Sequence, residues 1–337
     1  MVSPTRRRFL TTTAAGLLGL AATGCSINTR RRPIPRARKQ GPLDIAVIGV
    51  GGRGAANLAG VADQNIVALC DVDRNHLQAA AQRHPDAALY GSFESMLDEV
   101  PLDAVVVSTP DHTHFPAAFA ALGKQLDVYC EKPLTRTVHE ARVLAEEASF
   151  QHAVTQMGIQ IHAGGNYRRV VELIRSGAIG RVHEAHCWVG KHWGGGERPT
   201  DTPPVPETLD WPRWLGAAPP RPYHPVYHPA GWRRFWDFGT GTLGDMGCHH
   251  LDLPFWALGL GLPESVAVEG PPVHAETAPT SMRARWDFPG RVVPSGPVDS
   301  VLANPVTLWW HDGGLRPPQF ERDELPDWGD GTLFVGE

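Results

Sequence analysis

Residues 43–54 read LDIAVIGVGGRG, a short apolar run that leads directly into a glycine-rich turn. An apolar, β-branched run of this length is typical of a strand buried in a parallel sheet. The turn matches the pattern G-x-G-x-x-G, and a helical segment over 55–61 follows it. In this order Gly49 permits a tight turn, Gly51 admits a pyrophosphate close to the backbone, and Gly54 lets helix and strand pack. The stretch therefore predicts a dinucleotide site, with the phosphates at the helix N-terminus.

A second strand, over 66–70, ends at Asp71. Asp71 follows the turn at close to the roughly 20-residue spacing expected for the carboxylate that binds the adenosine ribose. Such a carboxylate binds the ribose hydroxyls and repels a 2′-phosphate, which favours NAD over NADP, although Arg74 nearby softens that preference. A helix N-cap is the alternative role for Asp71. The candidate residues of the turn itself are Gly49, Gly51, Gly52, Arg53 and Gly54.

Strands and helices continue to alternate along this part of the chain. The predicted strands cover residues 103–110 and 126–130, and the helix between them covers residues 111–123. The second of these strands ends in Glu131-Lys132-Pro133. Alternation of this kind predicts a doubly wound parallel sheet, the N-terminal Rossmann domain of an α/β protein.

The rest of the chain predicts a second α/β domain. Residues 190–238 are rich in Pro, Gly and Trp and have little periodicity, so they predict a long loop that shapes the substrate site. The remaining predicted elements are a helix over 166–176 and strands over 181–189, 265–268, 282–288, 305–310 and 332–335.

The N-terminus, residues 1–25, has the features of a signal peptide. Arg6, Arg7 and Arg8 precede a mild apolar stretch over 10–22 that ends in small residues. A membrane span needs about 20 strongly apolar residues, so this stretch is too short. The pattern R-R-x-F-L resembles the twin-arginine signal, which carries folded proteins out of the cytoplasm. A basic disordered tail is the alternative interpretation.

Cys25 ends a segment that resembles the lipobox of bacterial lipoproteins, with Ala22 where Leu is usual. Acylation of Cys25 would anchor the protein to the outer side of the cytoplasmic membrane, and simple cleavage would leave it periplasmic. Both outcomes stay open, and no other membrane contact is expected. Residues 26–42 carry Arg, Pro and Lys without apolar periodicity, which predicts a flexible tether.

Bulk composition excludes some classes of partner. The chain has 337 residues, of which 42% are hydrophobic and 20% charged, as in ordinary globular proteins. A net charge of −5 gives no reason to expect nucleic acid. The cysteines after Cys25 have no C-x-x-C spacing, which argues against zinc-ribbon or thioredoxin chemistry.

Several motifs recur in a specific order along the chain. They are the glycine turn, Cys70-Asp71-Val72-Asp73, Thr109-Pro110-Asp111-His112, Glu131-Lys132-Pro133, Gly177-Ala178-Ile179-Gly180 and the run over 239–249. Together they resemble the Gfo/Idh/MocA family of glucose–fructose oxidoreductases and inositol dehydrogenases, from about residue 43 to the end. The resemblance implies an NAD-binding Rossmann domain over 43–155 and a substrate and oligomerisation domain over 156–337. That second domain would carry an open, mostly antiparallel sheet.

The resemblance also implies a homo-oligomer that transfers hydride between NAD and a sugar or polyol. It assigns catalytic roles to Lys132, Asp245 and His249, and cofactor contacts to Thr109, Pro110, His112, Glu131 and Lys132. Asp245 and His249, at i and i+4, share one helix face. His249 would be the general base for oxidation, Asp245 would orient it or bind an adjacent hydroxyl, and Lys132 would hold the reacting oxygen. The alternatives are a solvated lysine and a surface Asp–His pair.

No metal site is expected from the sequence. Four potential ligands within eight residues cannot all face one way on a helix: Asp245, His249, His250 and Asp252. His224 and His228 lie in the Pro-rich loop among tryptophans. They are interpreted as packing around an insertion, with the lining of a sugar pocket as the alternative.

Three functions fit these observations. The first is an exported, NAD(H)-dependent dehydrogenase or reductase of a sugar, polyol or sugar derivative. The second is a glycosidase of the same family, in which bound NAD is transiently reduced and then regenerated. The third is a non-catalytic sugar-binding lipoprotein. Members of the family usually continue well beyond the last predicted strand, so the C-terminal domain is expected to be shortened.

Overall fold

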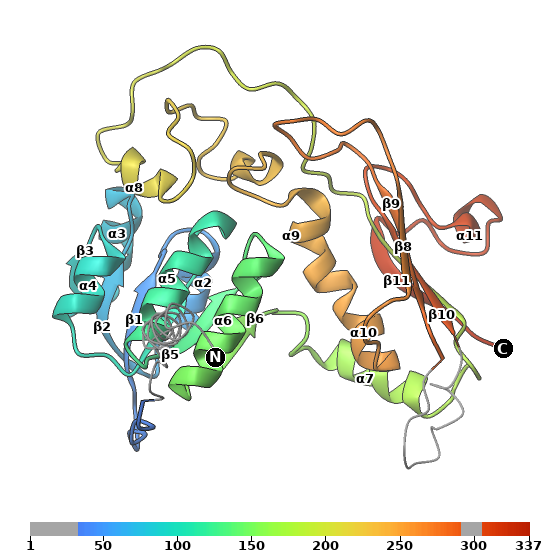
Figure 1. Cartoon of the computed structure of the whole chain (residues 1–337), viewed down its shortest axis with the longest axis horizontal. Coiled ribbons are helices and arrows are strands. Elements are labelled where there is room, and N and C mark those ends of the chain that lie inside the picture. The colour runs from blue at the N-terminus through green and yellow to red at the C-terminus, as the bar shows by residue number, and fades with distance from the viewer. Residues whose placement is uncertain (1–32, 291–304) are drawn as a thin grey trace, which may run out of the picture. The chain divides into compact units, whose positions relative to one another are not determined.

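The computed structural model describes residues 33–290 and 305–337. The chain divides into two units, Met1–Pro35 and Arg36–Glu337. The second unit holds every helix and strand of the described residues, in two sheets with their helices (Figure 1).

Most of the predicted N-terminal organisation lies outside the described residues. This applies to the signal peptide over 1–25, to Cys25, and to the first part of the tether over 26–42. Within the described part of the chain, no helix is long and apolar enough to cross a membrane.

The first sheet has six parallel strands in the order β3-β2-β1-β4-β5-β6. Its strands are β1 (Asp44–Ile48), β2 (Asn65–Cys70), β3 (Ala88–Tyr90), β4 (Ala104–Val107), β5 (Asp127–Glu131) and β6 (Thr155–Gly158). Its helices are α2 (Arg53–Gly60), α3 (Arg74–Ala81), α4 (Phe93–Glu99), α5 (Asp111–Gly123) and α6 (Val138–Gln151). The strand order reverses between β1 and β4, the point at which doubly wound sheets bind their ligands.

The alternation of side chains along β1 explains why helices cover both faces of this sheet. Ala46 and Ile48 pack into a core with α4, α5 and α6, whereas Ile45 and Val47 pack into a second core with α2 and α3. A strand that is apolar on both faces needs helices on both sides of the sheet, because only then are all of its apolar side chains removed from water. The predicted Rossmann sheet is confirmed, with each predicted element within a few residues of its expected bounds.

The second sheet is mixed, in the order β11-β7-β10-β9-β8. Its strands are β7 (Glu184–Val189), β8 (Ser265–Glu269), β9 (Arg283–Phe288), β10 (Val306–His311) and β11 (Asp330–Val335). Only β10 and β7 pair in parallel, so the sheet is mostly antiparallel, as predicted. The helices α7 (Gly165–Arg175), α9 (Gly241–His250) and α10 (Asp252–Leu258) lie along one side of it, and the short α11 (Pro318–Glu321) lies on the other (Figure 1).

The predicted loop over 190–238 contains two short elements, α8 (Trp211–Leu215) and the 3-10 helix η1 (Gly231–Arg234). Its aromatic side chains form a core of their own, in which Trp211, Trp214 and Phe238 are buried. The indole rings of Trp211 and Trp214 stack with their centroids 4.7 Å apart. Aromatic packing of this kind gives the segment a defined shape without regular secondary structure.

Candidate active site

The glycine turn has the geometry that a pyrophosphate requires. Gly49 has a φ of 81°, and a Cβ placed on Gly54 would lie 1.9 Å from the carbonyl oxygen of Gly49. Gly52 precedes α2, and no side chain caps this helix. The N–H of Gly54 donates to the Gly51 carbonyl oxygen at 2.8 Å, and the neighbouring N–H groups of the first turn, which have no side-chain cap, can bind an anion.

Asp71 stands at the end of β2, beside this turn. Its Oδ2 accepts a hydrogen bond from the backbone N–H of Val50 at 2.9 Å, and its Oδ1 accepts one from that of Asp73 at 2.9 Å. A carboxylate offers about four lone-pair positions, so two remain for ribose hydroxyls. The N-cap of α3 is Asp73, which accepts from Asn75, so the alternative capping role falls to Asp73 and not to Asp71.

Glu131 joins the end of β5 to the glycine turn. Its Oε1 accepts from Arg53 Nε at 3.1 Å and from Asn57 Nδ2 at 3.0 Å, and its Oε2 accepts from the backbone N–H of Lys132 at 3.2 Å. The buried carboxylate thus fixes α2 and the backbone of Lys132 relative to each other. Asn57 also donates to the Ser108 hydroxyl at 2.8 Å. Sequence reasoning missed Asn57, because an isolated Asn on a helix carries no motif.

Lys132 and Asp245 meet directly, although 113 residues separate them. Lys132 Nζ lies 2.6 Å from Asp245 Oδ1 and 2.7 Å from the carbonyl oxygen of Asp245. Trp193 Nε1 donates to the other carboxylate oxygen at 2.7 Å, and Arg233 and Lys191 lie at 3.5 and 3.7 Å from the carboxylate. Burial would raise the pKa of Asp245, but Lys132 and the other two cations hold it below its usual value. The structure therefore joins two of the three predicted catalytic residues.

His249 follows Asp245 on the same helix, α9, and its side chain is buried, with no hydrogen-bond partner for Nδ1 among the described residues. Burial, and then the charge of Lys132, lowers the pKa of His249 to about 4, so the ring is neutral at neutral pH. The carboxylate of Asp245 is hydrogen-bonded to Lys132 and Trp193. In this state Asp245 orients Lys132 rather than His249.

The turn after β4 holds three predicted cofactor contacts, Thr109, Pro110 and His112, and the structure places His112 in a different environment from the other two. Within the part of the chain that the structure describes, the buried Oγ1 of Thr109 has no hydrogen-bond partner, and Pro110 occupies the N-cap position of α5. The His112 ring instead packs against Trp214 and Phe238, and its Nε2 is 2.9 Å from the Trp214 carbonyl oxygen. Burial lowers the pKa of His112 to about 4, so this contact is a donation from the neutral ring. The His112 side chain packs against the aromatic loop, residues 190–238. This role differs from the predicted cofactor contact.

Asp111 is a second residue of this site that sequence reasoning passed over, although it lies within the quoted T-P-D-H motif. It is 5% exposed, and its Oδ2 accepts a hydrogen bond from the Thr240 hydroxyl at 3.2 Å. Burial raises the pKa of Asp111 to about 7, against the opposing charges of Arg233 and Lys132. A group that titrates near neutral pH therefore lies within electrostatic reach of Lys132 and Asp245.

The pKa of Asp111 predicts a pH-dependent effect of Asp111→Asn. Because the folded-state pKa is raised, the unfolded chain releases the proton first, and the wild type loses stability as pH rises from about 4 through about 7. Removing the carboxylate should therefore raise the free energy of unfolding, by up to about 4 kcal/mol at about pH 8. Denaturant unfolding at about pH 4 and about pH 8 checks this, with the exposed Asp63→Asn as control. An equal effect at both pH values would contradict it.

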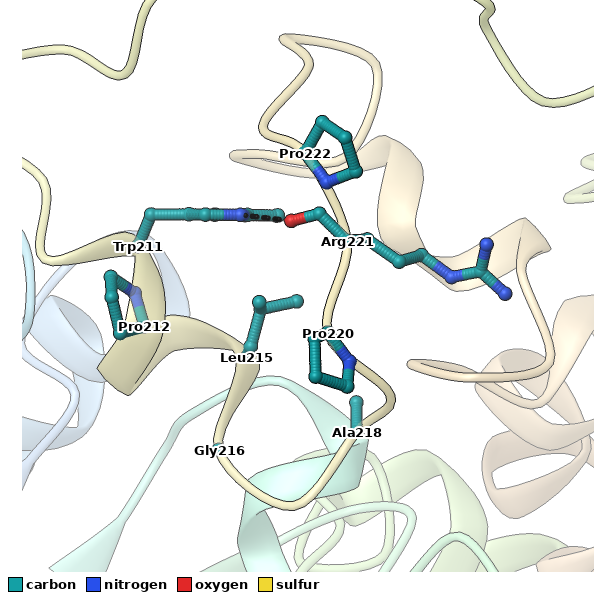
Figure 2. Close-up of a pocket in the computed structure, with 8 residues that line it drawn as sticks. All are labelled: Trp211, Pro212, Leu215, Gly216, Ala218, Pro220, Arg221 and Pro222. Carbon is teal, nitrogen blue, oxygen red and sulfur yellow. Dashed lines mark hydrogen bonds between the residues drawn. The ribbon is translucent and has the colours of Figure 1, made fainter. Parts of the chain in front are cut away.

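Two cavities involve the loop over 190–238 and the start of α9. One, of about 500 Å³, is formed by the aromatic loop, with Trp211, Leu215 and Pro220 among its lining residues (Figure 2). Trp211 Nε1 donates to the Arg221 carbonyl oxygen across it at 2.7 Å. The other, of about 320 Å³, lies at the start of α9 and is lined by 240–244 and by segments near 279 and 312. The lining of the second cavity includes Gly244, the sequence neighbour of Asp245, but not Lys132, Asp245 or His249.

The fold and the site together define a two-domain, dinucleotide-binding α/β protein with a Lys–Asp pair where its sheet binds ligands. Residues 43–159 match the Gfo/Idh/MocA oxidoreductase family, NAD-binding Rossmann fold, and residues 169–291 match the C-terminal α/β domain of the same family. The two matches span more than half of the chain. The chain belongs to the Gfo/Idh/MocA family.

Curated relatives match over about half of this chain. Inositol 2-dehydrogenase 1 of Saccharopolyspora erythraea is 30% identical over 149 residues, which cover 42% of this chain and 44% of that protein. Inositol 2-dehydrogenase of Salmonella typhimurium is 27% identical over 175 residues, which cover 50% and 51% of the two chains. The match thus spans about half the length of these relatives.

Solved structures share the fold over most of the chain. The WlbA dehydrogenase from Bordetella pertussis, solved with NADH and UDP-GlcNAcA, has a TM-score of 0.62 at 19% identity, covering 88% of this chain and 77% of that one. GenD2 from gentamicin A biosynthesis, solved with NAD, has a TM-score of 0.60 at 20% identity, covering 90% and 73%. At this identity the likeness concerns the fold alone.

Proposed function

We propose that this chain is an exported NAD-dependent oxidoreductase that acts on a CH–OH group of a sugar, polyol or sugar derivative. The observation that carries the proposal is the contact of Lys132 with Asp245, with His249 one helical turn further along α9. This group lies beyond the carboxyl end of β5, in a sheet whose glycine turn fits a dinucleotide. Such ends are where doubly wound sheets bind their ligands.

The residues around the turn fit NAD. The free N–H groups of α2 would hold the pyrophosphate, and the open lone pairs of Asp71 would hold the ribose. The Asp71 carboxylate disfavours a 2′-phosphate, which supports NAD over NADP. When bound, the nicotinamide supplies or accepts the hydride at the substrate carbon.

The chain's own residues account for the proton and for orientation. Lys132, held by Asp245, can donate a hydrogen bond to the reacting oxygen and stabilise negative charge on it. The neutral His249 can accept the hydroxyl proton, but its pKa of about 4 makes it a weak base. Asp111, with a pKa of about 7, lies within electrostatic reach of Lys132 and accepts a hydrogen bond from Thr240.

A polyhydroxylated ring is the proposed substrate class. Relatives are named for inositol, and the WlbA structure contains a nucleotide sugar. Trp193 is an aromatic side chain at the site, and Arg233, Lys191 and the carboxylate of Asp245 offer several polar groups around it. Export by the twin-arginine route, a possible lipid anchor at Cys25 and homo-oligomer formation are part of the same proposal.

One observation favours a glycosidase with a transient redox cycle as the second candidate. The backbone of Thr208 accepts from Arg74 N–H at 2.9 Å, and Asp210 N–H donates to the Val72 carbonyl at 2.9 Å. The loop from the second domain is thus hydrogen-bonded to the segment directly after Asp71. A cofactor bound at Asp71 would leave slowly past this loop, which suits chemistry that regenerates NAD in place.

The first test is the nucleotide content of the full chain purified without added cofactor. We expect denaturation to release NAD(H) in about equimolar amount, measured by mass spectrometry, and NADP(H) only in traces. The absence of nucleotide, together with no binding of added NAD, would overturn the proposal. Product analysis with glycosides and free sugars then separates the two candidates, since only the glycosidase cleaves without net oxidation.

A further inference from the structure

Three potential metal ligands lie together at the start of α3, away from Lys132 and Asp245 in the sequence. Asp73, His76 and His228 each offer a ligand atom, and these atoms all lie within 4.8 Å of one another. The imidazole rings of His76 and His228 have their centroids 6.0 Å apart. Two imidazoles and a carboxylate are a donor set that zinc and neighbouring divalent transition metals prefer.

Local structure fixes two of the three ligands. Asp73 is the N-cap of α3, and its Oδ1 accepts from the Asn75 N–H at 2.9 Å. Its Oδ2 has no hydrogen bond within the described residues and remains available. His76 follows at i+3, which places it on the same side of the helix as Asp73.

The third ligand comes from the aromatic loop, which is fixed to the same corner by its backbone. A β-bridge pairs Asp73 with Leu209, next to the two hydrogen bonds of Thr208 and Asp210. The His228 ring packs edge-on against Trp214, with centroids 6.3 Å apart. His228 therefore reaches α3 from a segment whose position is already set, and not from a free chain end.

The surroundings of His76 match those of a metal-binding histidine. Its Nδ1 lies 3.8 Å from Asp71 Oδ2, too far for a hydrogen bond, so the carboxylate favours this orientation of the ring through its charge. Carboxylate–histidine–metal arrangements of this kind are usual around zinc. Bond lengths of about 2.0–2.1 Å put the ligands of tetrahedral zinc roughly 3.4 Å apart. The ligand atoms, which lie within 4.8 Å of one another, would therefore close by up to about 1.4 Å on binding.

We propose that Asp73, His76 and His228 bind a divalent transition-metal ion of the zinc class, with water completing the coordination. The ion would fasten the aromatic loop to α3, directly beside the glycine turn, because a Cβ on Gly51 would lie 2.4 Å from His76 Nδ1. This inference goes beyond the proposed function and does not depend on it. The sequence predicted no metal site, because no local spacing relates His228 to His76.

The test is zinc binding by the full chain, freed of metal and nucleotide by chelation and dialysis. We expect one Zn²⁺ per chain by calorimetry and elemental analysis, and no displacement by Mg²⁺, which prefers oxygen ligands. His76→Ala and His228→Ala should each weaken binding on the order of 100-fold or more, since even outer-sphere partners are worth 10- to 100-fold. His139→Ala removes an exposed histidine of α6 and should change nothing.

Asp73→Asn separates metal binding from folding, because Asn is as good an N-cap as Asp but a much weaker ligand. We expect it to keep the melting temperature of the metal-free protein and to lose the rise in melting temperature that zinc causes. A Cys25→Ser background removes a competing thiol, and NAD binding is measured separately on each variant.

Zinc affinity equal to wild type in His76→Ala and His228→Ala would overturn the proposal. So would unchanged zinc binding combined with lost NAD affinity, which would assign the three side chains to the cofactor instead. Failure of the proposed function would give a different result: the chain would bind zinc through these three residues but would bind no NAD.

Discussion

Lys132→Ala is expected to lower turnover by about 10²–10⁴-fold, the range typical of a group that handles the reacting proton or oxygen. The ammonium of Lys132 makes two hydrogen bonds to Asp245, so its loss removes the nearest cation from a buried carboxylate. It also removes the donor that would hold the substrate oxygen. Turnover is measured as NADH formation on polyols and sugars, and nucleotide content should stay at the wild-type level.

Two further variants make this result specific. Lys132→Met keeps most of the side-chain volume without the charge, so it should lose as much activity as Lys132→Ala; both variants lose the ion pair with the buried Asp245, and the free energy of unfolding of each is measured alongside turnover. Lys124→Ala removes an exposed lysine that pairs with Asp98, and should retain full activity. Equal turnover in Lys132→Met and wild type would contradict a catalytic role.

The same variants also test the non-catalytic alternative. A sugar-binding lipoprotein predicts that a Lys132→Ala, His249→Ala double variant binds ligand as well as wild type, with no turnover in either form. Our proposal predicts measurable turnover in wild type and its loss in the double variant. Ligand binding by calorimetry, run alongside turnover, distinguishes the two.

The parts of the site that are local in sequence were predictable. The glycine turn, the carboxylate after β2 and the i, i+4 pair on α9 each depend on a few neighbouring residues and on the geometry of one element. The order of these elements along the chain also indicated the parallel sheet. Their identification as parts of one active site, however, came from the resemblance and not from spacing.

The contacts that complete the site are long-range, and the sequence gives no sign of them. Asn57 binding to Glu131, Thr240 donating to Asp111, and the pairing of Asp73 with Leu209 each join segments separated by at least 74 residues. The pKa of Asp111 is a consequence of burial, which a motif does not encode. The short helices and the aromatic core of the loop over 190–238 were not predicted, because their packing follows neither the helical nor the strand period.

Gly54→Ala is expected to destabilise the Rossmann domain by about 3 kcal/mol or more, the upper part of the range for overpacking. An ideal Cβ at Gly54 lies 1.9 Å from the carbonyl oxygen of Gly49 and 3.3 Å from the Ser108 Cβ. The first of these neighbours is backbone in a tight turn, so it has no rotamer into which it can move. The α2 helix would have to shift away from β1, and the N–H groups that face the pyrophosphate would shift with it. Nucleotide content should therefore fall together with stability.

Gly60→Ala is the matched control, since Gly60 ends the same helix and a Cβ there meets nothing within 4 Å. By helix propensity this change should be neutral or stabilising, by up to about 1 kcal/mol. Denaturant unfolding and nucleotide content, measured on both variants, separate a general effect of Gly→Ala from the steric one at Gly54. If the two variants behaved alike, the close packing of α2 on the glycine turn could not be what holds the cofactor site in shape.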